Sequence, residues 1–308
     1  MNIKLKQILR WVILGAMLIF LAKALKDHWL EVTAIRIDEV GWSILAIATG
    51  VTLLAHTWAG WIWTWILQDL NQPVPTAEFI QVYLKTNIAK YLPGNLWHHY
   101  RRIVALKNAN VATGAATLSV LLEPLLLAAA ALIIVVMFGS RFAVSRNSLT
   151  VRVLQLLSLV IILIGVHPRF LNPVISFLYK LKAKKSDTQP TGAFSLERYP
   201  LRPLLGELGF LLIRGIGFIL TLFALMPLNI NQIPLLLGAF SFSWLLGFVV
   251  PGAPGGLGVF EATAIALLQN RFPSAAVISA IALYRLISII AETVGAGLAW
   301  LDERLAQS

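Results

Sequence analysis

The sequence contains no cysteine and few charged residues. The absence of cysteine excludes disulfide bonds, thiolate metal ligands and cysteine nucleophiles, and it leaves the redox compartment undecided. Charged residues make up 13% of the chain, about half of the share with which soluble domains cover their surface. Hydrophobic residues make up 58%, and the mean hydropathy is +0.79. We therefore expect most of this chain to lie in a membrane.

Acidic residues are scarce as well, because 14 Asp and Glu stand against 25 Lys and Arg. The formal net charge of +11 is of a kind found in nucleic-acid-binding proteins. Here, however, the basic residues fall mainly between apolar runs, where Lys and Arg mark the cytoplasmic side of a membrane protein. We therefore expect no nucleic-acid partner.

Motifs of common enzymes are missing too. The sequence has no Gly-x-Ser-x-Gly elbow, no His-Glu-x-x-His and no dense aspartate cluster, which are signatures of hydrolases and of metal-assisted chemistry. The adjacent His98 and His99 would point to different helix faces, with no carboxylate three or four residues on. We predict no enzymatic activity, no cofactor and no metal ion.

Apolar runs long enough to cross a bilayer, which takes about 20 residues, recur along the chain. They lie at about 8–25, 41–68, 111–138, 149–166, 204–227, 232–250 and 276–300. We expect an all-α, polytopic transmembrane bundle of about six to eight spans, forming a single domain over residues 1–308. The first run also resembles a signal peptide, with a cleavage site after Ala22-Lys23-Ala24 as the alternative. We interpret it as an uncleaved span because many more spans follow.

The longest polar interruption is a basic loop at 183–199, which joins the halves 1–182 and 200–308. A short interfacial helix at Leu171–Leu181 would precede it. The basic residues of this loop, of the N-terminal segment and of the stretch from Lys85 to Lys107 predict that both termini face the cytoplasm of the cell (inner) membrane. Arg141 and Arg146, on a predicted outer loop, oppose this orientation.

Two stretches, 76–100 and 251–270, are too polar or too interrupted for ordinary spans. The second holds Pro254-Gly255-Gly256-Leu257-Gly258, which cannot continue a helix because Pro lacks an N–H and Gly favours other dihedrals. Irregular backbone at membrane depth must be buried in protein, line a wet cavity or sit at the interface. We predict a re-entrant hairpin whose second helix starts near Gly258 and directs its N-terminal N–H groups at an anion. A plain interfacial loop is the alternative.

The first break, Pro93-Gly94-Asn95-Leu96-Trp97, resembles the second and is surrounded by basic, aromatic and amide side chains. Arg and Lys suit a phosphate headgroup, and Trp and Tyr favour the interface. The predicted headgroup-binding residues are Lys90, Asn95, Arg101, Arg102, Gly255, Gly256 and Gly258. Broken segments at corresponding positions of two halves indicate a transporter site in an inverted repeat. A positive-inside loop and a chance similarity are the alternatives.

Ionisable residues inside spans are costly and by default indicate function. The ones predicted here are Glu123, Glu207, Arg214, Glu261, Arg285 and Glu292. Glu207 and Arg214 are seven residues apart and would share one helix face, as would Arg285 and Glu292. Neutralising pairs between helices, which stabilise a fold without binding anything, explain such residues equally well.

At the two breaks the sequence resembles the family named for the transmembrane region of lysylphosphatidylglycerol synthase/flippase, over about residues 10–300. The resemblance rests on Pro93-Gly94 with a following Arg101 or Arg102, on Leu121-Leu122-Glu123, on Pro254 through Glu261, and on Arg285. The chain departs from the family where Pro124 and Leu127 replace a common Arg and Asp, and where Trp97-His98 replaces Gly-Glu. These departures imply a distinct subgroup.

The resemblance implies a lipid flippase or lipid-handling module without the soluble synthase domain. We expect it to move an anionic phospholipid or a polyprenyl-phosphate-linked lipid between leaflets, with membrane lipids as its partners. The alternative is a non-transporting, lipid-binding accessory subunit of a membrane glycosyltransferase or lipid synthase. Headgroup transfer by the chain itself is disfavoured because no acid–base constellation is evident.

Overall fold

A computed structural model describes residues 26, 29–91, 96–139, 149–173, 196–250 and 254–305. These residues are folded into helices, and the described ranges contain no strand. Five helical segments are long and apolar enough to cross a membrane. They are α3 (Glu39–Asp69), α6 (Thr113–Phe138), α9 (Leu201–Phe223), the segment Ile230–Val249 that contains α10, and α12 (Ser274–Leu305). The predicted all-α transmembrane bundle is confirmed.

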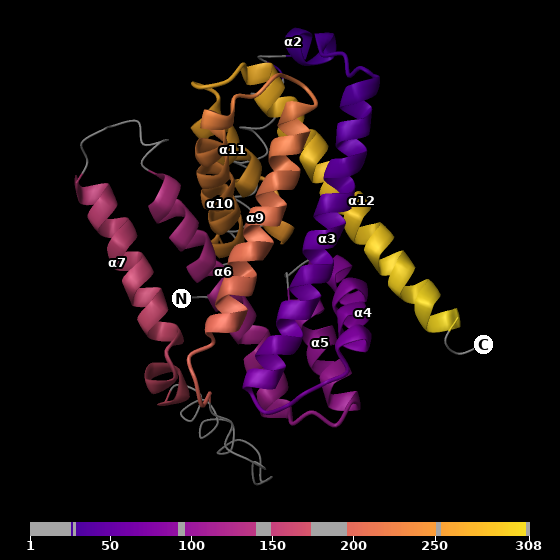
Figure 1. Cartoon of the computed structure of the whole chain (residues 1–308), viewed down its shortest axis with the longest axis vertical. Coiled ribbons are helices and arrows are strands. Elements are labelled where there is room, and N and C mark those ends of the chain that lie inside the picture. The colour runs from indigo at the N-terminus through magenta and orange to yellow at the C-terminus, as the bar shows by residue number, and fades with distance from the viewer. Residues whose placement is uncertain are drawn as a thin grey trace, which may run out of the picture.

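The bounds of the long helices follow the predicted apolar runs closely, because an apolar run of about 20 residues is typical of a membrane-spanning helix. A sixth helix, α7 (Leu149–Val166), stands at one side of the bundle and packs on α6 (Figure 1). A short helix, α2 (Trp29–Ala34), precedes α3. The predicted span at 8–25, the loop with Arg141 and Arg146, and most of the basic loop at 183–199 lie outside the described residues, as does most of the predicted interfacial helix at Leu171–Leu181.

The first broken stretch forms a hairpin of two short helices. Helix α4 (Thr76–Asn87) continues into a 3-10 turn, η1 (Ile88–Tyr91), and α5 (Trp97–Asn108) returns. The end of α5 lies close to the end of α3. The Ala112 N–H, just after α5, donates to Gln72 Oε1, just after α3, at 3.4 Å. At about 1.5 Å per residue, helices of 12 residues reach only part of the way across a bilayer.

The second broken stretch forms a hairpin from the other end of the bundle. Helix α10 (Ile233–Val249) follows the 3-10 turn η3 (Ile230–Gln232); after a second turn, η4 (Pro254–Gly256), α11 (Val259–Leu268) returns. Gly255, Gly256 and Gly258 have φ of 59°, 73° and 85°, a region that other residues rarely adopt. These three glycines lie within four residues and lead directly into α11.

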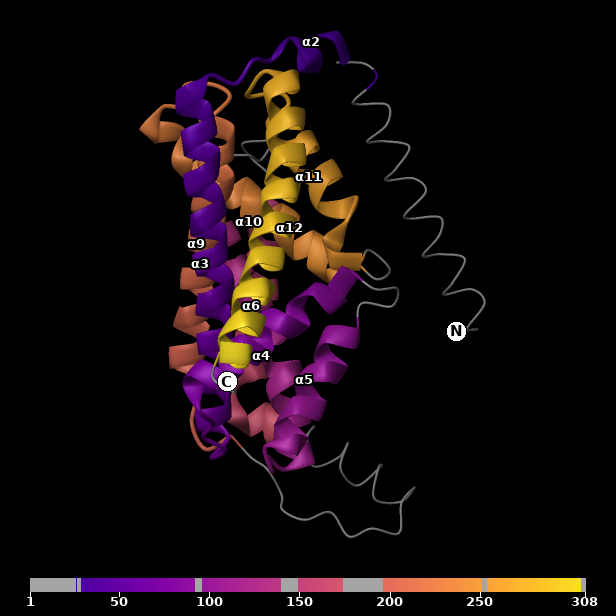
Figure 2. The same ribbon diagram turned by 90° about the vertical axis from the view of Figure 1, so that its right-hand side faces the viewer.

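The two halves repeat the same plan in opposite directions. Helix α3, the hairpin α4–α5 and helix α6 correspond to α9, the hairpin α10–α11 and α12. The packing corresponds too: α4 lies on α12 as α10 lies on α6, while α3 lies along α9 and η1 contacts η4. The two hairpins come from opposite ends and meet at mid-height (Figure 2). This arrangement agrees with the inverted repeat that the two Pro-Gly breaks predicted.

Small residues allow the two central helices to approach closely. A Cβ at Gly206 of α9 would lie 2.8 Å from Ile62 of α3, and one at Gly217 would lie 2.7 Å from the Thr52 hydroxyl. The Trp58 indole donates to the Gly206 carbonyl at 2.9 Å. In lipid no hydrophobic force draws helices together, and small residues allow their backbones to pack closely. The α3–α9 contact therefore forms a closely packed centre, and α4 packs on α3 while α10 packs on α9.

Candidate functional site: a charged cavity between two hairpins

A cavity of about 160 Å³ lies where the two hairpins meet. One water molecule needs about 10–15 Å³ of such space, so the cavity holds a group of roughly ten waters' size. Its charged lining comes from the first hairpin, from α6 and α9, and from α12: Lys90, Arg102, Glu123, Arg214, Arg285 and Glu292. The cavity thus collects charges from both halves of the chain in the middle of an apolar bundle.

Arg102 and Glu123 form a closed group at one end of the cavity. Arg102 Nη1 donates to Glu123 Oε2 at 2.8 Å, and the Tyr83 hydroxyl donates to Glu123 Oε1 at 2.8 Å. The Arg102 guanidinium also lies 3.6 Å from the centroid of the Tyr83 ring. Arg102 is 1% exposed and Glu123 6% exposed. A buried ion pair with its remaining hydrogen-bonding positions filled is a stable unit, so little of Arg102 is left for a ligand.

Arg285 and Glu261 form a second group that fixes the start of α11. Glu261 Oε1 accepts from Arg285 Nε at 2.6 Å, and Arg285 Nη1 donates to the Gly255 carbonyl at 3.1 Å. Glu261 Oε2 accepts the Gly258 N–H at 2.6 Å. The carboxylate therefore caps its own helix. The Gly258 N–H that we predicted to receive an anion is already engaged, so the structure gives that contact no support.

These two groups are counterparts in the repeat, with their signs exchanged. Arg102 of α5 pairs with Glu123 of α6 at 2.8 Å, whereas Glu261 of α11 pairs with Arg285 of α12 at 2.5 Å. Each pair ties the returning helix of a hairpin to the long helix that follows it. Three of the predicted intramembrane charges, Glu123, Glu261 and Arg285, thus form interhelical pairs, which was the structural alternative. Among the described residues, Glu207 does not pair with Arg214, and Arg285 does not pair with Glu292.

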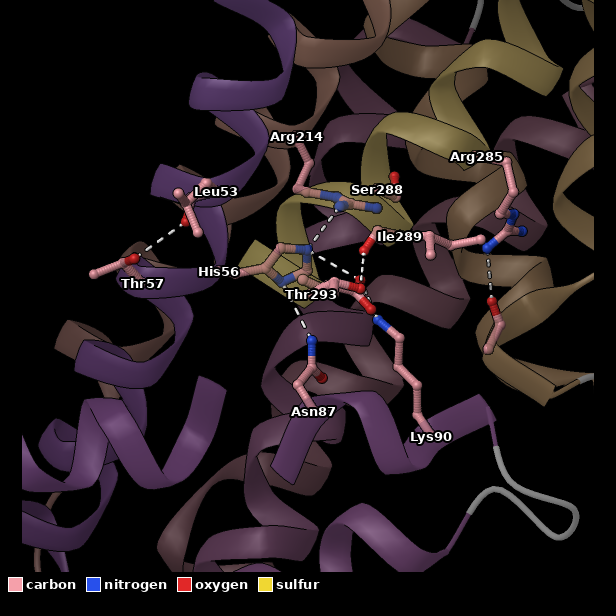
Figure 3. A network of polar contacts seen from close by, with 12 residues as sticks. Leu53, His56, Thr57, Asn87, Lys90, Arg214, Arg285, Ser288, Ile289 and Thr293 are labelled. Atoms are coloured by element: carbon pink, nitrogen blue, oxygen red, sulfur yellow. Dashed lines mark hydrogen bonds and ion pairs between the residues drawn. The ribbon is translucent and has the colours of Figure 1, made fainter. Parts of the chain in front are cut away.

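A third group is centred on Glu292, and its other members, His56, Asn87, Lys90 and Arg214, are labelled in Figure 3. Glu292 Oε1 is 2.6 Å from Lys90 Nζ and 3.1 Å from His56 Nε2. His56 Nε2 is also 3.0 Å from Arg214 Nη1, and His56 Nδ1 is 3.4 Å from Asn87 Nδ2. A neutral imidazole nitrogen either donates or accepts. If Nε2–H donates to Glu292 and Nδ1 accepts from Asn87, then Arg214 faces a donor rather than an acceptor.

Arg214 is therefore the unusual member of the site. It is 7% exposed, and it makes no ion pair with a carboxylate anywhere in the part of the chain that the structure describes. Its Nε is buried without a hydrogen-bond partner, and the Tyr284 ring lies 5.2 Å from its guanidinium carbon. A buried charge without a partner is costly. Such a charge on the wall of a cavity is a candidate anion-binding group.

The other predicted headgroup-binding residues lie at different places in the structure. Lys90, Gly255 and Gly256 line the cavity, and the two glycines allow the hairpins to touch. A Cβ at Gly255 would lie 3.0 Å from the Tyr91 ring. Arg101 is exposed on α5 and does not line the cavity, so it has no support as a ligand. Asn95 lies outside the described residues. Glu207 is buried with one oxygen unpartnered, but it does not line the cavity.

Sequence reasoning missed His56 and Asn87, which complete the Glu292 group. The rule on ionisable residues inside spans could have indicated His56, which is the histidine of the predicted span 41–68. No comparable signal marks Asn87, since amides are common near helix ends. It lies in the last turn of α4, and only the folded hairpin brings it to α3.

A comparison with known protein families covers the same part of the chain as the fold described above. A family model described as lysylphosphatidylglycerol synthase TM region matches residues 7–295 of the chain. The matched range includes both hairpins and all the residues that line the cavity. No curated protein matches the chain.

Proposed function

The chain belongs to the lysylphosphatidylglycerol synthase TM region family, and from this premise we propose that it is a lipid translocator. It carries the phosphate-bearing headgroup of an anionic phospholipid or of a polyprenyl-phosphate-linked lipid between the two leaflets. Family membership and the five apolar helices make it an integral membrane protein with a lipid-related role. Transport is the further step that we propose.

One observation carries this proposal: a polar cavity with an unpaired cation lies at the point where two hairpins from opposite ends meet. A charged headgroup cannot cross hydrocarbon without a substitute for water. Arg214, Lys90 and the surrounding dipoles offer that substitute. The acyl or prenyl tails would remain in the lipid while the headgroup passes through protein.

The inverted repeat is also compatible with a cavity that opens to either side of the membrane in turn. In transporters built from inverted repeats, the site lies near the midplane, and access alternates as one repeat moves against the other. Here each hairpin closes the cavity from one end of the bundle. Displacement of α4–α5 would open one end, and displacement of α10–α11 would open the other.

We propose no covalent step at this site. The two carboxylates that line the cavity, Glu123 and Glu292, are each bonded to a cation. A general acid or base must instead be free to exchange a proton with the substrate. The residues are therefore arranged to bind a headgroup and to release it unchanged.

The test is reconstitution of the full chain into liposomes that contain fluorescent phosphatidylglycerol, with an impermeant quencher added outside. We expect the inner-leaflet fraction to become quenched faster with protein than without it. Lys90→Gln should slow the crossing at least about tenfold, because the cavity loses a positive charge and Glu292 loses the cation that compensates it. Arg101→Gln, a matched loss of one charge outside the cavity, should leave the rate unchanged.

Failure to accelerate crossing of phosphatidylglycerol and of a polyprenyl-phosphate-linked lipid would overturn the proposal. Equal rates in the Lys90→Gln and Arg101→Gln proteins would also contradict it. Lipid that co-purifies with the protein but does not cross would favour the accessory-subunit alternative. The melting temperature of each variant in detergent separates loss of transport from loss of folding.

A further inference from the structure

The charges around the cavity do not balance. Four cations line it: Lys90, Arg102, Arg214 and Arg285. Three carboxylates are paired with three of these cations: Glu292, Glu123 and Glu261. The fourth cation, Arg214, has no carboxylate in the described part of the chain. With His56 neutral, the site holds an excess of one positive charge.

The neutral groups around Arg214 leave part of its guanidinium without an acceptor. His56 Nε2 lies 3.0 Å from Arg214 Nη1 and 3.1 Å from Glu292 Oε1, and in the tautomer whose Nε2–H donates to Glu292 this nitrogen cannot accept from the guanidinium. Arg214 Nε is buried without a partner. The guanidinium therefore retains donors for a planar, two-oxygen acceptor, such as the two non-bridging oxygens of a phosphate.

The carboxylates at the cavity are already compensated by cations. Glu123 is held by Arg102 and by the Tyr83 hydroxyl, and Glu292 is bonded through Oε1 to Lys90, while its Oε2 is buried without a partner. An amine that reached Glu292 Oε2 would therefore share a carboxylate whose charge Lys90 already balances. It would also raise the positive excess in a region with few waters to screen it.

We infer that this site selects a headgroup with a single negative charge on a phosphodiester, and that it rejects the aminoacylated, net-positive form of such a lipid. This inference rests on the proposed function and names the substrate class. One negative charge neutralises the site. A phosphomonoester carries about 1.5 to 2 negative charges near neutral pH and would leave an uncompensated charge of the opposite sign.

Two lipid sources carry this chemistry. Phosphatidylglycerol has a phosphodiester with hydroxyl groups beyond it, and a polyprenyl carrier joined to a sugar through one phosphate has the same linkage. Arg214 would bind the phosphate in both. The binding experiment below includes both sources and therefore tells which one is preferred.

The experiment measures binding of four lipids to the full chain in detergent, by native mass spectrometry or by quenching of intrinsic tryptophan fluorescence. The lipids are phosphatidylglycerol, lysyl-phosphatidylglycerol, phosphatidic acid and a polyprenyl phosphohexose. We expect at least one of the two phosphodiesters without an amine to bind about tenfold or more tightly than lysyl-phosphatidylglycerol and phosphatidic acid. Whichever phosphodiester binds more tightly identifies the source.

Variants assign the preference to Arg214. Arg214→Gln should reduce binding of the preferred phosphodiester about tenfold and abolish its advantage over lysyl-phosphatidylglycerol. Arg214→Lys keeps the charge but loses the two-pronged donor, so it should retain part of the preference. Arg101→Gln should keep all of it. The melting temperature of Arg214→Gln should not fall, because the change removes a buried charge that has no carboxylate partner.

Two results would overturn the inference: tight binding of lysyl-phosphatidylglycerol or of phosphatidic acid to the wild-type protein, or an unaltered preference in Arg214→Gln. If Arg214→Gln fails to fold, the wild-type preference and the Arg214→Lys variant still decide the question. Selective binding without headgroup crossing would overturn the proposed function alone. Crossing of lysyl-phosphatidylglycerol at the rate of phosphatidylglycerol would overturn this inference alone.

Discussion

Two buried arginines in this chain, Arg102 and Arg214, have similar exposures but different partners. Arg102 is bonded to Glu123 at 2.8 Å and Arg214 to no described carboxylate. Removing one member of a buried pair leaves the other charge uncompensated, which costs about 3–5 kcal/mol. We therefore expect Arg102→Gln to lower the free energy of unfolding by about that amount, measured by denaturant or thermal unfolding in detergent.

A double variant supplies the control. In Arg102→Gln/Glu123→Gln both charges are absent, so we expect most of the lost stability to return, with a coupling energy well above the error of the measurement. Additive effects of the two single changes would contradict the assignment of this pair as a structural unit. An Arg102→Gln protein as stable as the wild type would contradict it as well.

At this scale the sequence predicted which charged residues lie at the cavity better than it predicted their partners. Glu123, Arg214, Glu261, Arg285 and Glu292 were predicted because charge inside a span is costly, and all five are in or beside the cavity groups. Their partners could not be predicted, because pairing depends on which helices the fold brings together. Arg101 and Arg102 are adjacent in sequence, yet one is exposed and the other fully buried.

The turn η4, which precedes α11, depends on the positive φ of Gly256 and on its close approach to Gly247. Gly256 has φ of 73°, and a Cβ there would lie 3.2 Å from the Gly247 carbonyl oxygen. Gly256→Ala therefore meets both a strained backbone and a crowded space. We expect it to lower the free energy of unfolding by about 2 kcal/mol or more, with a lower melting temperature in detergent as the readout.

Gly50, in the middle of α3, is the matched control. A Cβ there would meet nothing within 4 Å, so Gly50→Ala should leave stability unchanged or raise it by up to about 1 kcal/mol, because Ala favours a helix. If Gly256→Ala proves as harmless as Gly50→Ala, then η4 does not have the packing described above.

At the scale of elements, the length of the apolar runs was sufficient to predict where the long helices lie. The predicted runs 41–68 and 111–138 became Glu39–Asp69 and Thr113–Phe138. The hairpins needed a different argument, that irregular backbone must be buried or must line a cavity. That argument predicted two breaks but not that η1 and η4 would touch, since contact across the repeat depends on the packing of α3 against α9.

For the whole molecule, the open question is which end of the bundle faces the cytoplasm. The end of α3 near Asp69 adjoins the return of α5, and the start of α3 adjoins the end of α9, where a Cβ on Gly41 would lie 2.9 Å from the Ala224 carbonyl oxygen. Basic residues gather at the first end: Lys85, Lys107, Arg169, Arg198, Arg202 and Arg304. Lys and Arg, rather than net charge, determine the orientation, so we predict that this end faces the cytoplasm.

The absence of cysteine makes this assignment directly testable. Asn108, at the end of α5, and Asn231, in η3, are both exposed, and the length of α3, 31 residues, puts its two ends about 46 Å apart. In intact cells, an impermeant maleimide should label Asn231→Cys, whereas Asn108→Cys should react only after permeabilisation. The unmodified chain has no thiol, so any labelling reports the introduced residue. The reverse pattern would invert the molecule in its membrane, and labelling of both sites in intact cells would refute a span between them.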